Sequence, residues 1–152
     1  MVGRVPMEES GAAKLGVTYK GVVYPRECDH MGHMNVASYV AKFDEATWQV
    51  FASCGITRDY MAREGAVMAG VHQALDYLRE LRAGEVISVR SSIVEVGARK
   101  LRWVHEMYDD ATNERVATCE LTAVHLDATS RKAKPFPESI RHKALELSGD
   151  DS

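Results

Sequence analysis

The feature that most constrains this chain is one long amphipathic segment between Asn35 and Gly55. Its apolar side chains recur at steps of three and four residues, which is the spacing of one face of a helix. These residues are Val36, Tyr39, Val40, Phe43, Ala46, Thr47, Val50 and Cys54. Asn35 is a favourable N-cap, and Gly55 is a favourable helix stop. The pattern predicts one long helix that forms the core of the fold.

The eight residues before this helix, from Cys28 to Asn35, carry an unusual amount of polar chemistry. They include a carboxylate, two imidazoles and a glycine. A helix N-terminus also offers unpaired backbone N–H groups and the positive end of the helix dipole. A carboxylate and an oxyanion site could therefore lie within a few residues of each other, which indicates catalysis on a carbonyl group.

Length and composition predict one globular domain. The chain has 152 residues, of which 45% are hydrophobic and 27% charged, enough for a real core. We expect a leader over residues 1–14, a domain over residues 15–147 and a tail over residues 148–152. A net charge of -3 and a pI near 6.1 argue against nucleic acid as the main partner.

Cysteine usage and hydropathy predict the compartment. Three cysteines, at positions 28, 54 and 119, form no C-x-x-C motif, so we expect no disulfide framework and a cytoplasmic location. No apolar run approaches the ~20 residues of a membrane span, and residues 1–16 lack the apolar core of a signal peptide.

Alternating apolar residues predict five strands around the long helix. The strands span residues 17–24, 66–78, 86–96, 101–108 and 115–127, with a helical turn at residues 57–64 and a terminal helix at residues 138–147. One strand, a long helix and four antiparallel strands predict an α+β fold whose sheet wraps around the helix. Strands this long expose edges that a monomer would have to protect.

This element order, with its loop, resembles the hotdog-fold thioesterases of the 4-hydroxybenzoyl-CoA thioesterase type. The sharpest part is Asp29-x-x-Gly32-His33-Met34-Asn35-x-x-x-Tyr39-x-x-x-Phe43-x-x-Ala46. Residues 84–89, residues 95–101 and the run Asp127-x-x-x-Arg131-x-x-x-Pro135-x-Pro137 also resemble that family, so the likeness covers about residues 17–137. It implies an acyl-CoA thioesterase that releases a free acid and CoA without a metal or organic cofactor.

The resemblance also implies an assembly and a catalytic carboxylate. Hotdog proteins generally pair two sheets edge to edge, which implies a homodimer or a tetramer with sites built from both subunits. Asp29 would act as nucleophile or general base, and the sequence does not separate these two roles. A purely structural capping role for Asp29 is disfavoured because Asn35 already supplies a cap. Backbone N–H groups at the helix start, with Val36 at the family position, would hold the oxyanion.

The other loop residues have less specific interpretations. His33 either assists Asp29 or the substrate, or makes a structural hydrogen bond to the loop, and Gly32 permits a tight turn or a close substrate approach. Met34 and Asn35 are predicted to contact substrate. His30 and His33 form a D-H-x-x-H pattern with Asp29, but no further ligand has recognisable spacing, so we predict no metal site.

Basic and apolar residues elsewhere are candidates for binding the rest of the substrate. The CoA phosphates require cations at the rim of the site, and the candidates are Arg99, Lys100, Arg131, Lys132 and Lys134. Met31, Met34, Trp48, Met68 and Val71 could line an acyl pocket, although core packing is the favoured explanation for each of them. The sequence leaves the acyl group open between aromatic, short polar, charged and medium-chain acids.

Three alternatives stay open at this stage. Asp44 and Glu45 lie on the long helix, and a second branch of hotdog thioesterases has its catalytic carboxylate there. Another hotdog enzyme, such as a hydratase or dehydratase, would need a differently placed catalytic pair. A non-catalytic acyl-CoA-binding or regulatory module is the third alternative.

Overall fold

The computed structural model of the chain describes residues 15–149. The elements are β1 (Val17–Val22), the 3-10 helix η1 (Pro25–Glu27), α2 (Val36–Ser53), α3 (Arg58–Glu64), β2 (Ala66–Tyr77), β3 (Val86–Val96), β4 (Lys100–Asp109), β5 (Glu114–Asp127) and α4 (Glu138–Ser148). The predicted leader, residues 1–14, lies outside the described residues, as does most of the predicted tail. Among the described residues, no helix is long and apolar enough to cross a membrane.

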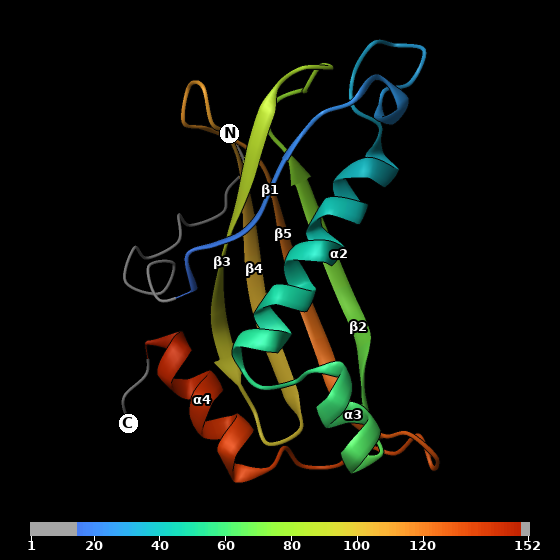
Figure 1. Cartoon of the computed structure of the whole chain (residues 1–152), viewed down its shortest axis with the longest axis vertical. Helices are drawn as coiled ribbons and strands as arrows, with labels where there is room; N and C mark the ends of the chain where they lie inside the picture. Colours follow the sequence, from blue (N-terminus) through green and yellow to red (C-terminus); the bar gives the residue numbers. More distant parts are fainter. Residues whose placement is uncertain (1–14, 150–152) are drawn as a thin grey trace.

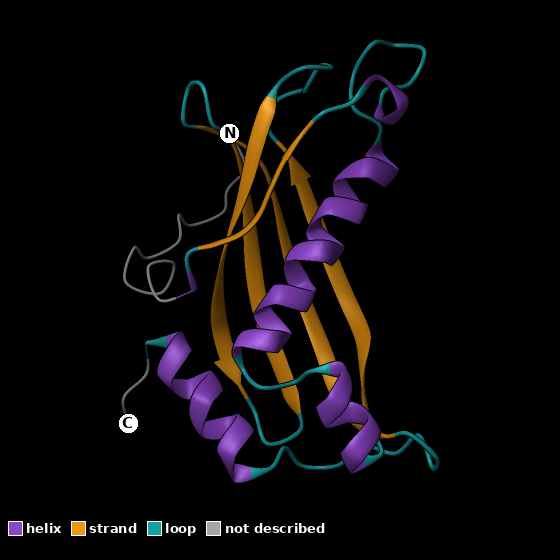
Figure 2. Cartoon of the chain, viewed as in Figure 1, coloured by secondary structure: helices purple, strands orange, loops and turns teal. Residues whose placement is uncertain are grey.

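The five strands form one antiparallel sheet in the order β1-β3-β4-β5-β2. Helix α2 lies across one face of this sheet, and α3 and α4 lie near the end of the sheet that α2 reaches last (Figures 1 and 2). The predicted α+β fold, in which a long antiparallel sheet wraps one central helix, is confirmed.

Helix α2 begins and ends where the sequence predicts. The Asn35 side chain accepts a hydrogen bond of 2.8 Å from the Ala37 N–H, and Gly55, at a φ of 90°, follows the end of the helix in the left-handed region. The buried face consists of Tyr39, Lys42, Phe43, Ala46, Thr47, Val50 and Phe51. Val36 lies at the exposed end of the predicted apolar face, whereas Lys42 is buried. The charged side chain is accommodated because Nζ of Lys42 lies 2.8 Å from a carboxylate oxygen of Glu27.

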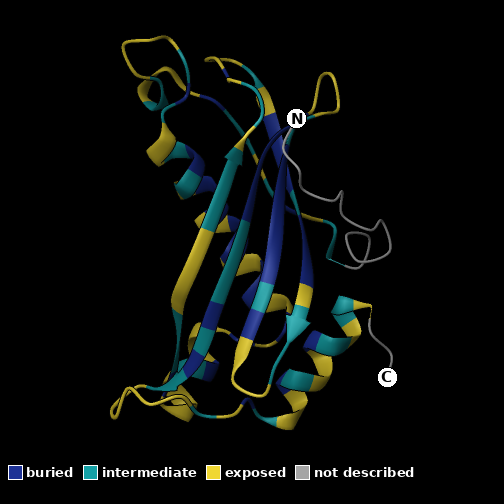
Figure 3. Cartoon of the chain, turned by 180° about the vertical axis from the view of Figure 1, so that it is seen from behind, coloured by how far each residue is buried: buried dark blue, intermediate teal, exposed yellow. Residues whose placement is uncertain are grey.

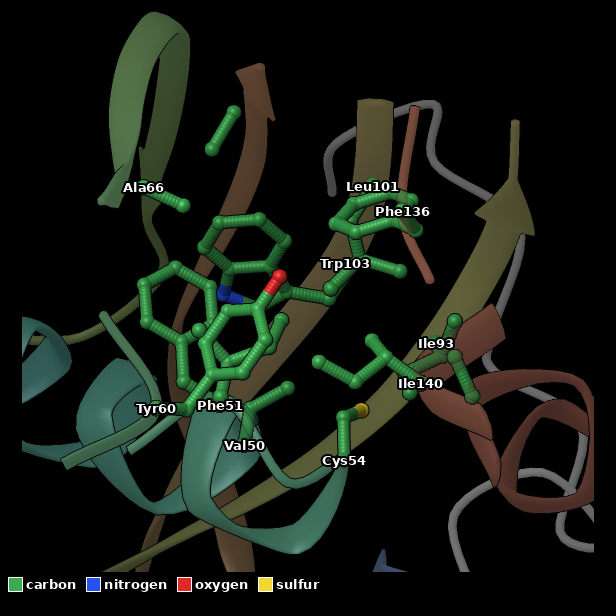
Figure 4. Packing of buried hydrophobic residues seen from close by; sticks show 13 residues of the cluster. Val50, Phe51, Cys54, Tyr60, Ala66, Ile93, Leu101, Trp103, Phe136 and Ile140 are labelled. Carbon is green, nitrogen blue, oxygen red and sulfur yellow. The ribbon is translucent and has the colours of Figure 1, made fainter. Parts of the chain in front are cut away.

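Two apolar clusters divide the core along α2. One surrounds the N-terminal half of the helix and includes Tyr39, Phe43, Val89 and Met107. The other surrounds the C-terminal half, where Val50, Phe51 and Cys54 face residues of the sheet, α3 and α4, among them Trp103, Tyr60 and Ile140 (Figure 4). Burial of large apolar side chains contributes about 1.5–3 kcal/mol each, so α2 carries much of the stability of the domain.

A chain of hydrogen bonds separates the two clusters. Thr18 donates to the Val89 carbonyl at 3.3 Å, and its hydroxyl lies 2.7 Å from Ser91 Oγ. Ser91 Oγ therefore donates to Thr18 and accepts from Nδ1–H of His105, 2.6 Å away. His105 Nε2 then accepts from the Thr47 hydroxyl at 2.8 Å. Every proton in this order has an acceptor when His105 is a neutral imidazole that carries its hydrogen on Nδ1.

Burial agrees with that assignment. His105 is fully buried, and desolvation lowers its pKa to about 3. Trp103 Nε1–H completes the network by donating to Thr47 at 3.2 Å. We call the residues Thr18, Thr47, Ser91, Trp103 and His105 the core network.

Strand β2 forms a long free edge of the sheet. Within the described chain it pairs only with β5, and a bulge at Val71 shifts the register between Gly70 and His72. Its middle residues are exposed, whereas β3 and β4 are mostly buried, as Figure 3 shows. The unpaired N–H and C=O groups of this edge can hydrogen-bond to another strand.

Candidate active site

The loop before α2 is held by its own hydrogen bonds. Cys28 and Met34 form a bridge pair, Asp29 N–H donates to the His33 carbonyl at 3.0 Å, and Gly32 N–H donates to the Asp29 carbonyl at 3.0 Å. Gly32 has a φ of 84°, a conformation that side-chain-bearing residues rarely adopt, which explains the glycine at this turn. The loop is therefore a closed turn that presents Asp29 in one defined position.

The Asp29 carboxylate is only partly used by this turn. Its Oδ1 accepts a hydrogen bond of 2.9 Å from the Met31 N–H. Within residues 15–149, no protein group donates to Oδ2. The side chain is exposed and lines a pocket of about 510 Å³. One carboxylate oxygen thus stays available to a ligand in that pocket.

The pocket lies between the loop, the start of α2 and the end of β2. Its lining residues are Asp29, Met31, His33, Met34, Val36, Tyr39, Tyr77, Leu78, Arg79 and Glu80. A second pocket of about 500 Å³ lies at the other end of α2, between α3 and α4, and contains none of the predicted site residues. The predicted catalytic residues Asp29, His33 and Val36 therefore share one pocket, together with Met34.

The Val36 N–H, the first backbone amide of α2, is the one that Asn35 does not cap. The Asn35 side chain accepts from Ala37 N–H, and the Asn35 carbonyl accepts from Ser38 N–H at 2.9 Å and from Tyr39 N–H at 3.4 Å. Among the described residues, no group accepts from the Val36 N–H. An unpaired N–H at the positive end of a helix dipole, in the wall of the Asp29 pocket, is suited to bind an oxyanion.

The remaining loop residues serve several purposes. His33 Nδ1 lies 3.0 Å from a carboxylate oxygen of Glu80, so the imidazole bridges the loop to the segment after β2. Met34 is buried, and its N–H donates to the Leu81 carbonyl at 2.7 Å. Asn35 caps the helix and donates its own N–H to the Glu27 carbonyl at 2.8 Å. His30 is exposed.

Sequence reasoning did not single out the wall formed by residues 77–80. Tyr77 and Tyr39 form an edge-to-face pair with ring centroids 5.2 Å apart. Arg79 lies in the same wall and pairs with three carboxylates: Asp109, Glu85 at 3.3 Å and Glu114 at 3.0 Å. The run Tyr77-Leu78-Arg79-Glu80, with an aromatic and two charged residues directly after a strand, is the sequence signal that could have marked this wall.

The Glu27–Lys42 pair is also absent from the sequence reasoning. Burial alone would raise the pKa of the Glu27 carboxyl, but hydrogen bonds from Lys42 and from Tyr24 N–H outweigh it and lower that pKa. The pair ties η1 to α2 just behind the Asp29 loop. No apolar periodicity could have indicated it.

The predicted phosphate-binding residues lie at the opposite end of the sheet. Ala66 pairs with Asp127 at one end of the β2–β5 ladder, and Tyr77 pairs with Ala117 at the other. Eleven residue steps along the strand separate these ends, a distance of about 36 Å. Arg99, Lys100, Arg131, Lys132 and Lys134 belong to the Asp127 end, whereas Asp29 belongs to the Tyr77 end, as the loops in Figure 1 show. Within one chain the structure does not bring the two groups together.

The basic segment after β5 is anchored from within. His125 is fully buried, and its Nδ1 donates to the Lys134 carbonyl at 2.7 Å, so its Nε2 accepts from the Tyr60 hydroxyl at 2.8 Å. Lys134 Nζ donates to the Glu64 carbonyl at 3.0 Å, and Lys100 lies 3.6 Å from Glu95. Arg131 and Lys132 are exposed.

The alternative chemistries have little geometric support. Asp44 and Glu45 are exposed on α2, and Asp44 lines a different pocket, beside β2. Of the acyl-pocket candidates, Met31 and Met34 line the Asp29 pocket, whereas Trp48, Met68 and Val71 do not. Residues 15–149 contain no group of three or more His, Cys, Asp or Glu side chains that could hold a metal ion. All three cysteines are free, and burial raises the pKa of Cys54 and of Cys119 to about 12, which suits neither as a nucleophile.

Comparison with proteins of known sequence finds relatives that are named as thioesterases. The chain is 24% identical over 123 residues to betainyl-CoA thioesterase of Pseudomonas aeruginosa, which covers 81% of this chain and 77% of that protein. It is 30% identical over 115 residues, 76% of its length, to an L-carnitine dehydrogenase/betainyl-CoA thioesterase of a Rhizobium species. The chain spans 23% of the length of that second relative.

Solved structures share the fold. A Staphylococcus aureus protein solved in complex with CoA matches with a TM-score of 0.82 at 18% identity, over 90% of this chain and 86% of that one. A 1,4-dihydroxy-2-naphthoyl-CoA thioesterase from Synechocystis matches with a TM-score of 0.76 at 18% identity, over 86% of this chain and 96% of that one. These matches confirm the predicted hotdog-type fold.

Most of the sequence also matches a family model. Residues 23–144 match the model of the thioesterase-like superfamily, which covers the Asp29 loop, α2 and the whole meander of strands. Together with the relatives, this match confirms the predicted relationship to hotdog thioesterases and supports the prediction of a hydrolase. The chain belongs to the thioesterase-like superfamily.

Proposed function

We propose that the chain hydrolyses the thioester bond of an acyl-CoA to a free acid and CoA, with Asp29 as the catalytic carboxylate. The observation that carries this proposal is the shared pocket, which is lined by a carboxylate and by an N–H at a helix start. Among residues 15–149, one oxygen of that carboxylate and that N–H have no hydrogen-bond partner. A carboxylate with a reference pKa near ~3.9 is ionised at neutral pH and can act as base or nucleophile.

The reaction proceeds through one tetrahedral intermediate if Asp29 is the base and through two if it is the nucleophile. As a base, the carboxylate takes a proton from water, the water oxygen bonds to the thioester carbon, and the carbonyl oxygen becomes an oxyanion at the Val36 N–H. As a nucleophile, the carboxylate itself bonds to that carbon, the C–S bond breaks, and the CoA thiolate departs, so that an anhydride remains. Water then opens the anhydride to the free acid and the Asp29 carboxylate, and one proton of that water passes to the CoA sulfur. In the base route the C–S bond breaks at the tetrahedral stage, and the CoA sulfur takes up the proton that Asp29 removed from water. His33 and Gly32 support the loop geometry in this scheme.

The test of Asp29 is thiol release from a panel of acyl-CoAs. Wild type is expected to release CoA from at least one thioester, and the Asp29→Asn variant to release it at least about 100-fold more slowly. Unchanged release in the variant would remove Asp29 from the mechanism. Tight acyl-CoA binding without any turnover in wild type would favour the non-catalytic binding module instead.

A second copy of the chain would complete the site. Two β2 edges that pair antiparallel about a two-fold axis bring the Ala66 end of one strand next to the Tyr77 end of the other. The basic segment of the partner, with Arg131 and Lys132, would then lie beside the Asp29 pocket and meet the CoA phosphates. We propose a homodimer of this kind, which also forms the unit of any tetramer.

Mixing two defective variants tests this assembly. Asp29→Asn lacks the carboxylate, and the double variant Arg131→Ala, Lys132→Ala lacks two phosphate-binding cations. If each site takes residues from both copies, a refolded equal mixture contains hybrid dimers with one intact site and recovers about a quarter of wild-type activity. If each site lies within one copy, the mixture stays as inactive as its components. Sedimentation of the wild type as a monomer would also contradict the proposal.

We further propose that the protein acts in the cytoplasm, because all three of its cysteines carry free thiols. The relatives described above do not agree on one acyl group. Two of them are named for betainyl-CoA, and one solved structure is named for 1,4-dihydroxy-2-naphthoyl-CoA. A cationic and an aromatic acyl group are both compatible with that set.

A further inference from the structure

The wall of the Asp29 pocket opposite the loop combines aromatic rings with carboxylates. Tyr39 and Tyr77 line it as an edge-to-face pair with ring planes at 80° to each other, and Tyr77 is the more exposed ring of the pair. Tyr39 is buried, whereas Tyr77 is 47% exposed. Burial raises the pKa of Tyr39 to about 12 and also raises that of Tyr77, so both phenols are neutral at pH 7. Neutral aromatic faces attract cations, and quaternary ammonium groups above all.

The charges around these rings are predominantly negative. Asp29 and Glu80 line the pocket, and although one Glu80 oxygen lies 3.0 Å from His33 Nδ1, the Glu80 side chain is 72% exposed. Arg79 is the one arginine or lysine among the lining residues, and its guanidinium pairs with Asp109, Glu85 and Glu114. Because three carboxylates compensate one guanidinium, Arg79 does not provide a free anion site.

These features separate three classes of acyl group. An anionic acyl group would meet Asp29 and Glu80, and no lining cation of the same chain is free to bind it, while the basic segment that the proposed dimer adds is assigned to the CoA phosphates. A neutral aromatic acyl group would stack on the tyrosines but would remove water from two carboxylates, which is costly. A quaternary ammonium has no N–H to satisfy, gains from the aromatic faces and neutralises the carboxylates.

We propose that this pocket accepts an acyl group that ends in a quaternary ammonium, held against Tyr39 and Tyr77 and balanced by Glu80. The inference rests on the proposed thioesterase function, because the pocket is read as the acyl side of the Asp29 site. It adds the class of substrate and the residues that select it.

Two pairs of substrates isolate the charge from the shape. Betainyl-CoA and 3,3-dimethylbutyryl-CoA differ only in nitrogen against carbon at the branch point, and 4-(trimethylammonio)butyryl-CoA and 5,5-dimethylhexanoyl-CoA form a longer pair. The ammonium of betainyl-CoA also activates its own carbonyl group, so the informative quantity is how a substitution changes the ratio of kcat/KM within each pair. The longer pair is nearly free of that inductive effect.

Tyr77 is the residue to change, because Tyr39 belongs to the core and its loss would threaten folding. In Tyr77→Leu, the cationic-to-neutral ratio is expected to fall about 3- to 30-fold in at least one pair. Tyr77→Phe is the matched control, since it keeps the ring and should change the ratio less than about 2-fold. Glu80→Gln should lower the ratio about 2- to 5-fold, and less so at high salt.

The outcomes separate this inference from the proposed function. A ratio that Tyr77→Leu and Glu80→Gln leave unchanged in both pairs, with thioesters still hydrolysed, overturns the cationic subsite and leaves the thioesterase intact. If wild type hydrolyses no thioester, the proposed function fails, and the same four ligands are titrated by calorimetry into wild type and Tyr77→Leu. A preference for the cationic ligands that is lost in Tyr77→Leu would still support the subsite, and equal affinities would overturn it.

Discussion

Helix α2 carries polar chemistry in two places, and these places use their hydrogen bonds differently. In the core network at its middle, Thr47 and His105 are buried, and each donor meets an acceptor. At its start, Asp29 keeps an open carboxylate oxygen, and among the described residues the Val36 N–H has no acceptor. A closed buried network stabilises a fold, whereas open groups in a pocket are available to a substrate. The difference identifies which polar residues to test for catalysis.

The largest expected effect is on catalysis, at Asp29 before the start of α2. Asp29→Asn should lower kcat/KM at least about 100-fold, equivalent to roughly 2.7 kcal/mol of transition-state stabilisation, while the melting temperature stays within about 2 °C of wild type. The stability is preserved because the amide oxygen of asparagine can still accept from Met31 N–H. Thiol-release kinetics and thermal denaturation measure the two quantities. Asp44→Asn, an exposed carboxylate elsewhere on α2, is the control and should leave both nearly unchanged.

The next effect belongs to the closed network. Thr47→Val keeps the shape but removes the hydroxyl that donates to His105 and accepts from Trp103 Nε1–H, which is left with its contact to His105 Nε2. The variant should have a free energy of unfolding about 2 kcal/mol lower than that of wild type. Chemical denaturation measures it, with Thr47→Ser as a control that keeps the hydroxyl and should lose less. A Thr47→Val protein as stable as wild type would mean that the network contributes nothing to stability.

Lowering the pH should reduce the free energy of unfolding through His105, the imidazole of the core network. The folded pKa of His105, about 3, lies below the reference value of 6.5, so its contribution is present above pH 6.5 and is lost as the pH falls toward 3. Between pH 7 and pH 5 this single group should remove about 2 kcal/mol of unfolding free energy. Denaturation at several pH values tests it, because the His105→Gln variant should show a shallower dependence on pH. Parallel curves for the two proteins would contradict the assignment.

The smallest effect on stability is expected at the Asp29 pocket, for the contact between His33 and Glu80. The His33–Glu80 contact is largely exposed on the Glu80 side, and such pairs contribute roughly 0–1 kcal/mol. Glu80→Gln should therefore change the free energy of unfolding by less than about 0.5 kcal/mol. A loss of 2 kcal/mol or more would show that the loop is held mainly by this contact and would weaken the contrast between the two places.

The sequence predicts the elements well because their signals are local. The three- and four-residue spacing gave α2 to within a residue, and alternation gave β3, from Val86 to Val96, with its observed bounds. The Asp29 loop could also be recognised, since a carboxylate, a glycine turn and a cap follow one another within a few residues. In these cases the residues that determine the structure are neighbours in the chain.

What the sequence could not supply depends on contacts between distant segments. The wall at residues 77–80 meets the Asp29 loop only because β2 ends there, and no spacing links the two. Lys42 interrupts an apolar face because its partner, Glu27, lies 15 residues earlier. The basic residues were expected beside the site, yet the strand register carries them to the far end of the same chain.

The core network has a consequence for the precision of the pocket. An apolar face alone would let a helix rotate or shift by a turn at little cost in free energy, because apolar contacts are not directional. Thr47 instead locks α2 to β4 through a directional bond, and Ser91 and Thr18 extend that lock to β3 and β1. The lock lies about 17 Å along the helix from Val36. The buried His105 thus fixes the position of α2, and through it the position of the Val36 N–H relative to the Asp29 carboxylate.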